Sequence, residues 1–212
     1  MEEKKRLCGY YNYTVVLTYL GMLVGFTGIL LAVEGAYGQA VICLMTAGVC
    51  DMFDGAVAAT RQRDDREKRF GMQIDSLSDL ICFGVFPAVF VYRISGQTYL
   101  SFLAGSLYVL CALIRLAYFN VLEEERQREE GGRMQWYLGL PVTSAALAVP
   151  ALYVAVDGWG GEMFFSALLI LLAFLFLLPV KIRKPYLVGK IGIVFTGVVE
   201  FVILFIGLAM EV

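Results

Sequence analysis

Histidine is absent from this chain of 212 residues, and charged residues make up only 17% of it. Without imidazole there can be no Ser-His-Asp hydrolysis, no histidine-ligated zinc or haem, and no proton relay through histidine. An ordinary soluble domain contains about 25% charged residues, so this chain is too poor in charge to cover a water-facing surface. The net charge of −2 adds no basic surface, and we predict no nucleic-acid partner.

Cysteine offers little chemistry either. The chain has five cysteines and no C-x-x-C pair, so neither a disulfide framework nor a thiolate zinc site is predicted. All but the first fall inside apolar runs, where a free cysteine is usually a small core residue. We interpret them in that way: Cys8, Cys43, Cys50, Cys82 and Cys111.

What the chain has in abundance is apolar sequence, with 59% hydrophobic residues and a mean hydropathy of +0.73. Seven runs are long enough, or nearly so, to cross about 30 Å of hydrocarbon as helices. These predict an all-α, polytopic membrane bundle that forms a single domain over residues 1–212, with residues 4–13 as an additional short interfacial helix. The predicted spans are 7–33, 37–60, 71–92, 94–114, 134–156, 163–180 and 189–210.

Basic residues set the predicted orientation. Lysine and arginine gather before the first span and in the loops after the second, fourth and sixth spans, whereas the alternate loops contain a single basic residue. Because basic loops stay on the cytoplasmic side, the N-terminus is predicted to be cytoplasmic and the C-terminus external, in a multi-pass protein of the cell membrane. The charged segment 123–133 is expected to be a solvated cytoplasmic loop.

Four aspartates interrupt the second and third spans. Asp51 and Asp54 are three residues apart, and Asp75 and Asp79 are four apart, so each pair shares one face of its helix. Such carboxylates cost about 2.5–3.5 kcal/mol each at a helix centre, less near the interface. The two spans form an antiparallel hairpin in which both pairs lie at similar depth. All four carboxylates are therefore expected to converge near the cytoplasmic face.

Converging carboxylates repel one another unless cations neutralise them, and the sequence places no basic residue on these faces. Two divalent ions would supply four positive charges, and ligation by oxygen alone favours Mg²⁺ or Mn²⁺, with Ca²⁺ as an alternative. Small residues at Gly55, Ala58 and Gly71 would let a ligand approach the backbone. Plain helix packing is the alternative explanation for Gly55 and Ala58.

The motif D51-M-F-D54-G55-A-V-A58, followed by G71-M-Q-I-D75-S-L-S-D79, resembles the signature of the CDP-alcohol phosphatidyltransferase family. The resemblance implies a helical membrane domain, a CDP-linked lipid as substrate, and a homodimer. It also implies that Asp51, Asp54 and Asp75 hold two divalent ions with the help of Asp79, which is in addition the general base. An alcohol attacks the β-phosphorus, and CMP leaves.

Three further segments resemble the bacterial phosphatidylserine synthases within that family. They are residues 70–87, the I114-R-L-A-Y-F-N120 segment, and the Y137-L-G-L-P141 segment. Together they imply CDP-diacylglycerol as the donor and L-serine as the acceptor. Glycerol phosphate and inositol phosphate remain the alternative acceptors.

Basic residues near the aspartates are the candidates for binding the substrate's phosphates. The family signature has arginine where this chain has Ala59, so Arg61, Arg63 or Lys68 must replace it, and we assign Arg61 and Lys68 to the substrate site. Arg115 directly follows the fourth predicted span, at its cytoplasmic end. It is predicted to bind the serine carboxylate or a lipid phosphate, with snorkelling toward the interface as the alternative.

Two other interpretations stay open. Buried carboxylates also mark ion pathways, so a cation-coupled transporter is the alternative from another functional class. That alternative leaves the spacing of the aspartates unexplained. The departure at position 59 also allows an inactive relative. Glu200, at mid-depth of the last span, is assigned no function.

Overall fold

The computed structural model describes residues 9–128, 136–156, 162–179 and 181–183, together with Gly197 and Val202. Its elements are α1 (Tyr13–Glu34), α2 (Tyr37–Ala58), α3 (Asp65–Asp79), the π-helical segment η1 (Leu80–Val85), α4 (Phe86–Ile94), α5 (Tyr99–Arg128), β1 (Trp136–Leu138), the 3-10 turn η2 (Val142–Ser144), α6 (Ala145–Ala155), α7 (Glu162–Leu177) and β2 (Lys181–Arg183).

The first four predicted spans are present as long apolar helices. They are Tyr13–Glu34, Tyr37–Ala58, Asp65–Ile94 and Tyr99–Arg126, and the third of them joins α3, η1 and α4 into one rod. Two shorter apolar helices of 10–17 residues follow, where the fifth and sixth spans were predicted. The chain is thus a helical membrane protein. Except for Gly197 and Val202, the predicted seventh span at 189–210 lies outside the described residues, as do Glu200 and residues 4–8 of the interfacial helix.

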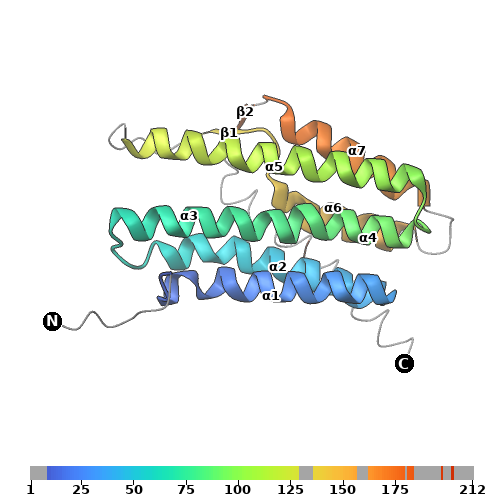
Figure 1. The fold of residues 1–212 in the computed structure, drawn as a ribbon, viewed down its shortest axis with the longest axis horizontal. Coiled ribbons are helices and arrows are strands. Elements are labelled where there is room, and N and C mark those ends of the chain that lie inside the picture. The colour runs from blue at the N-terminus through green and yellow to red at the C-terminus, as the bar shows by residue number, and fades with distance from the viewer. Residues whose placement is uncertain are drawn as a thin grey trace.

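Figure 1 shows the rod of α3 and α4 at the centre of the structure, with α1 and α2 on one side and α5 with α7 on the other. Helix α1 packs closely against α2 and the rod, because three residues of its buried stripe are glycines. A Cβ at these positions would touch Cys50, Cys82 and Phe86, so helix packing requires the missing side chains. The glycines are Gly21, Gly25 and Gly28.

Two helices extend beyond their predicted ends. Helix α3 begins six residues before Gly71, because the Asp64 carboxylate accepts a hydrogen bond of 2.7 Å from the backbone N–H of Glu67 and caps the helix. Helix α5 continues to Arg128, so the prediction of a loop from residue 123 was wrong over residues 123–128. An ion pair between Glu123 and Arg126, one turn apart, supports this extension.

The fifth predicted span was wrong in its first half. Residues 136–138 form β1, which pairs antiparallel with β2, so the helical fold includes one short two-stranded element. Gly139 follows with a φ of +75°, a conformation that glycine adopts readily, and Pro141 follows in an extended conformation. Helical structure starts only at Val142.

The π-helical segment η1 begins directly after Asp79. Its wider turn changes the backbone pairing, and the buried Tyr108 hydroxyl of α5 donates a hydrogen bond of 2.5 Å to the carbonyl oxygen of Phe83 in this segment. Segments of this kind occur often at functional sites. Here η1 lies between the aspartates of α3 and the buried aromatic residues of the core.

Candidate metal and nucleotide site

The four aspartates line one small pocket between α1, α2 and the start of the rod. Asp51 and Asp54 come from α2, and Asp75 and Asp79 come from α3. Helix α1 closes the pocket with Leu17, Thr18 and Gly21, and the remaining lining residues are Ala47, Cys50, Ser78, Cys82 and Phe83. The structure thus brings together the two carboxylate pairs that the sequence spacing placed on neighbouring helices.

Three of the carboxylates form the tightest group. One oxygen each from Asp51, Asp54 and Asp75 lie within 4.8 Å of one another, a spacing that could hold a metal ion. Asp79 is not a member of this group. It lines the same pocket and lies close enough to Asp51 for their carboxyl groups to interact. The geometry therefore separates three candidate ligands from a fourth carboxylate beside them.

Asp54 is held by a residue that the sequence did not reveal. The Thr18 hydroxyl of α1 donates a hydrogen bond of 3.1 Å to Oδ2 of Asp54, and both side chains are buried. This contact orients the Asp54 carboxylate within the pocket. Its place on the buried stripe of α1, which also carries Thr14, was the available signal, but only packing places Thr18 opposite α2.

None of the ion pairs in the described part of the chain involves these aspartates. Two cations near the edge of the pocket have other partners: Arg61 lies 3.5 Å from Glu67, and Lys68 lies 3.6 Å from Asp65. A partly buried group of carboxylates without a cationic partner is unfavourable, and divalent ions are the partners that an all-oxygen donor set selects. The residues present therefore fit the metal ions predicted from the sequence.

The small residues around the pocket have different surroundings. A Cβ on Gly55 would have no atom within 4 Å, so helix packing does not explain this glycine. Ala58, one turn further along, is half-buried. A Cβ on Gly71 would lie 2.9 Å from Nη1 of Arg63, because this guanidinium folds against α3. Gly55 therefore leaves open space beside Asp54, whereas Gly71 leaves room for an arginine.

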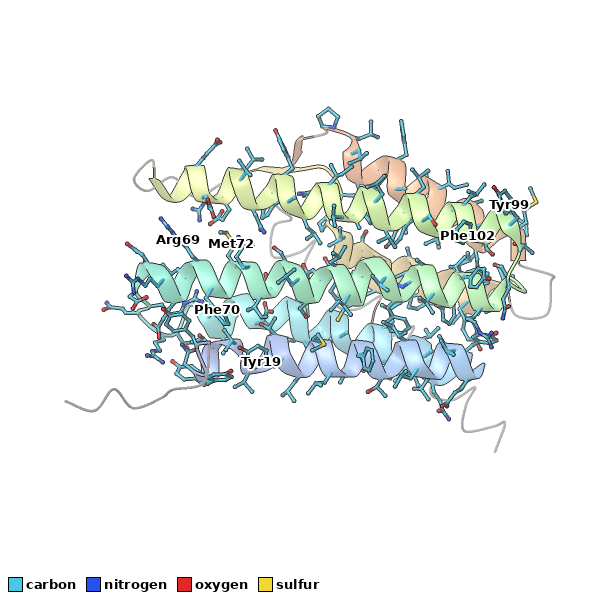
Figure 2. All side chains as sticks on the ribbon, viewed as in Figure 1. Tyr19, Arg69, Phe70, Met72, Tyr99 and Phe102 are labelled. Carbon is cyan, nitrogen blue, oxygen red and sulfur yellow. The ribbon has the colours of Figure 1, made fainter. Side chains whose placement is uncertain are left out.

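The N-terminal segment and the start of α3 are tied together at the rim. Asn12 donates a hydrogen bond of 3.2 Å to Glu67, and the rings of Tyr10 and Phe70 lie 5.3 Å apart. Figure 2 shows Phe70 on the side of α3 that faces α1, whereas Arg69 and Met72 lie on the side toward α5. These contacts fix the part of α3 that leads into the aspartates.

The three segments that resembled phosphatidylserine synthases meet in the structure. Ser76 of the first donates a hydrogen bond of 2.8 Å to Asn120 of the second. Arg115 of the second lies with Nε 3.5 Å from the Cβ position of Gly139 in the third. Arg115 is only 8% exposed and stacks on Phe119, with its guanidinium carbon 5.0 Å from the ring centre. Its Nε is buried in the bundle and has no hydrogen-bond partner among the described residues.

The sequence model of CDP-alcohol phosphatidyltransferase matches residues 11–206, which include the four aspartates and Arg115. The chain belongs to the CDP-alcohol phosphatidyltransferase family. The resemblance carried by the two aspartate motifs is thereby confirmed, and the chain is a membrane-embedded transferase rather than a transporter.

The chain is also similar in sequence to several curated enzymes of this family. Archaetidylserine synthase of Methanothermobacter thermautotrophicus is 34% identical over 89% of this chain and 76% of its own length. CDP-diacylglycerol–serine O-phosphatidyltransferase of Saccharomyces cerevisiae is 34% identical over 66% of this chain and 54% of its own length. The enzyme of that name from Mycobacterium leprae is 34% identical over 63% of this chain and 43% of its own length. The chain thus spans about half the length of the yeast and mycobacterial relatives.

Proposed function

We propose that this protein transfers the phosphatidyl group of CDP-diacylglycerol to L-serine and releases CMP, as a single membrane domain over residues 1–212. The observation that carries the proposal is the pocket of four aspartates between α1, α2 and α3 in a member of this family. The serine hydroxyl oxygen attacks the β-phosphorus, a new P–O bond forms, and the bond to CMP breaks.

The carboxylates of Asp51, Asp54 and Asp75 are proposed to hold two Mg²⁺ or Mn²⁺ ions, with Asp79 at their edge. When bound, such ions neutralise phosphate oxygens and stabilise the charge that develops at the reacting phosphorus. The open space beside Gly55, together with Ala58 and Gly71, supports nucleotide binding along this face of α2 and α3. Arg61 and Lys68 stand at the rim for the phosphates, each next to an acidic partner that it would have to leave.

Asp79 is proposed as the general base. A proton must leave the serine hydroxyl as the new bond forms, and a carboxylate beside the three ligands can accept it. Its place outside the tight group of three supports this role, because an oxygen that is not held by an ion stays available for a proton. Asp79 would then serve both as a neighbour of the ions and as the base.

Serine as the acceptor is supported from two sides. The names of the relatives from three organisms include serine, although they differ in the lipid. In the structure, buried Arg115 lies at Gly139, where a guanidinium can pair with a carboxylate in bidentate geometry. Glycerol phosphate and inositol phosphate have no carboxylate, so Arg115 would distinguish the acceptors only if serine binds there.

The decisive assay supplies membranes that contain the protein with CDP-diacylglycerol and one labelled acceptor at a time. We expect CMP release and labelled lipid with L-serine. Release with glycerol phosphate or inositol phosphate instead would keep the reaction class and replace the acceptor. No CMP release with any of the three would overturn the proposed function.

Replacement of Arg115 is expected to raise the KM for serine rather than the KM for the lipid substrate. Arg115→Gln should raise the KM for serine at least about tenfold, because a charge-assisted pair is lost, and leave the KM for CDP-diacylglycerol within about twofold. Arg126→Gln, on the same helix near its end, is the control. A selective increase in the KM for the lipid would assign Arg115 to the lipid phosphate instead.

Replacement of Thr18 is expected to weaken metal binding. Thr18→Val removes the hydrogen bond that orients Asp54, and losing such a partner of a ligand typically costs 10- to 100-fold in metal affinity. Titration of the purified protein with Mn²⁺ measures the effect directly. Thr18→Ser should keep most of the affinity. Thr27→Val on an exposed part of α1 is the matched control, and equal losses from both valine variants would contradict the role of Thr18.

We further propose that the aspartate pocket faces the cytoplasm of a cell membrane and that the protein forms a homodimer. The basic residues around the start of α3 support this orientation. A cysteine at exposed Asp65 should react with an impermeant maleimide only after the cells are opened, and one at exposed Glu34 should react in intact cells. The opposite labelling would reverse the orientation.

The mass of the detergent-solubilised protein tests the proposed homodimer.

A further inference from the structure

Arg63 lies outside the helices, in the connection between α2 and α3, yet its side chain returns to the site. Its Nη1 atom lies 2.9 Å from the position that a Cβ on Gly71 would occupy. Gly71 precedes Asp75 by one turn, so the two positions share a face of α3 about 6 Å apart along the axis. The guanidinium therefore covers the face of α3 that carries the site aspartates, on the rim side of them.

The other cations of this region are engaged or directed elsewhere. Arg61 pairs with Glu67, and Lys68 pairs with Asp65. Arg66 is exposed and lies nine residues before Asp75, which places it about 180° around the helix from that carboxylate. Arg69 lies on the side of α3 toward α5 (Figure 2). Among the described residues Arg63 has no ion pair, and it is half-buried against the site face.

We propose that Arg63 binds the diphosphate of the nucleotide-linked substrate. The absence of a side chain at Gly71 leaves the space in which the Arg63 guanidinium lies. The inference rests on the proposed function, because it is that function which brings a diphosphate to the aspartates. A guanidinium stays charged and binds two phosphate oxygens at once. It supplies the positive charge that the chain lacks at Ala59, from a position four residues further along the chain.

The test measures the affinity of the purified full chain for CDP and for CMP in the presence of Mg²⁺. Arg63→Gln is expected to weaken CDP binding at least about tenfold, as loss of a charge-assisted contact does, and to weaken CMP binding less. It should also raise the KM for CDP-diacylglycerol without changing the KM for serine. Arg66→Gln, with the same change of charge on the opposite face of α3, should bind CDP as the wild type does. Equal CDP affinity in Arg63→Gln and Arg66→Gln would overturn the proposal.

Gly71→Ala provides an independent test, because the added methyl group would displace the guanidinium of Arg63. It is expected to weaken CDP binding in the wild type and to add little in the Arg63→Gln background, since both changes remove the same contact. Additive losses would mean that Gly71 acts on its own and would overturn its role of leaving room for the Arg63 side chain, whereas the role of Arg63 itself is decided by the comparison with Arg66→Gln. If Arg63→Gln does not fold, unchanged CDP affinity in Gly71→Ala would overturn the proposal instead.

Failure of this proposal can be told from failure of the proposed function. A wild-type protein that binds CDP through Arg63 but transfers nothing to any alcohol would refute the function and keep Arg63 as a diphosphate ligand. A wild-type protein that makes phosphatidylserine, with Arg63→Gln indistinguishable from it, would refute only the role of Arg63.

Discussion

Replacing Asp79 by asparagine is expected to lower kcat by at least about 100-fold while binding of CDP-diacylglycerol is largely kept. Asparagine keeps the shape of the side chain and one ligand oxygen, but it cannot accept the proton of the serine hydroxyl. The structure supports a selective effect, because Asp79 lines the pocket without belonging to the tight group of three carboxylates. Proximity matters here more than basicity, since two bound reactants held in line gain much of the reduction in barrier.

The neighbouring aspartates supply the comparison. Asp51→Asn and Asp54→Asn should lose metal and nucleotide affinity as well as kcat, because they remove members of the ligand group. Asp65→Asn, the same change at an exposed position at the start of α3, should leave all three quantities within about twofold. Turnover of Asp79→Asn within about threefold of the wild type, or complete loss of its nucleotide binding, would remove Asp79 from the role of base.

The parts of the fold that follow from burial alone could be predicted from the sequence. Long apolar runs located the first four helices, because a membrane requires about 20 apolar residues per span and satisfied backbone hydrogen bonds. The spacing of three and four residues placed each pair of aspartates on one face, and the helical hairpin then brought the pairs together. Local periodicity is enough for such predictions, since neighbours on a helix are also neighbours in sequence.

The ends of the helices were harder to predict, because hydropathy indicates where a segment leaves the membrane and not where its helix ends. Capping by Asp64 and the charged last turns of α5 extend helices into segments rich in charged residues. In the opposite sense, Gly139 and Pro141 interrupt an apolar run that hydropathy alone assigned to a span. These signals were present in the sequence, but a count of apolar residues gives them no weight.

Side-chain contacts that involve α1 and the α2–α3 connection were not predicted. The hydrogen bond from Thr18 to Asp54 joins residues 36 positions apart, and it exists because glycines let α1 approach α2. The return of Arg63 to Gly71 depends on the path of a short connection. Arg63 lies outside the helices and has no periodic pattern around it, so sequence alone left three basic residues as equal candidates near Ala59.

Removal of divalent ions is expected to abolish transfer, and Mg²⁺ or Mn²⁺ should restore it. Three carboxylates with oxygens within 4.8 Å of one another have no cationic partner among the described residues. Without ions they repel both one another and the phosphates of the substrate. The expected loss is therefore complete rather than partial, and binding of CDP should fall together with kcat.

The comparison of variants separates a metal site from a general effect of the chelator. Asp54→Asn should raise the Mn²⁺ concentration needed for half-maximal activity by more than Thr18→Val does, because it alters a ligand rather than the partner of a ligand. Thr27→Val should match the wild type. Measuring the metal content of the protein after EDTA treatment excludes ions that are too tightly bound to strip. Full activity in protein shown to be free of divalent metal would mean that the three carboxylates bind no catalytic ion, and the aspartate pocket would then need another explanation for its uncompensated charge.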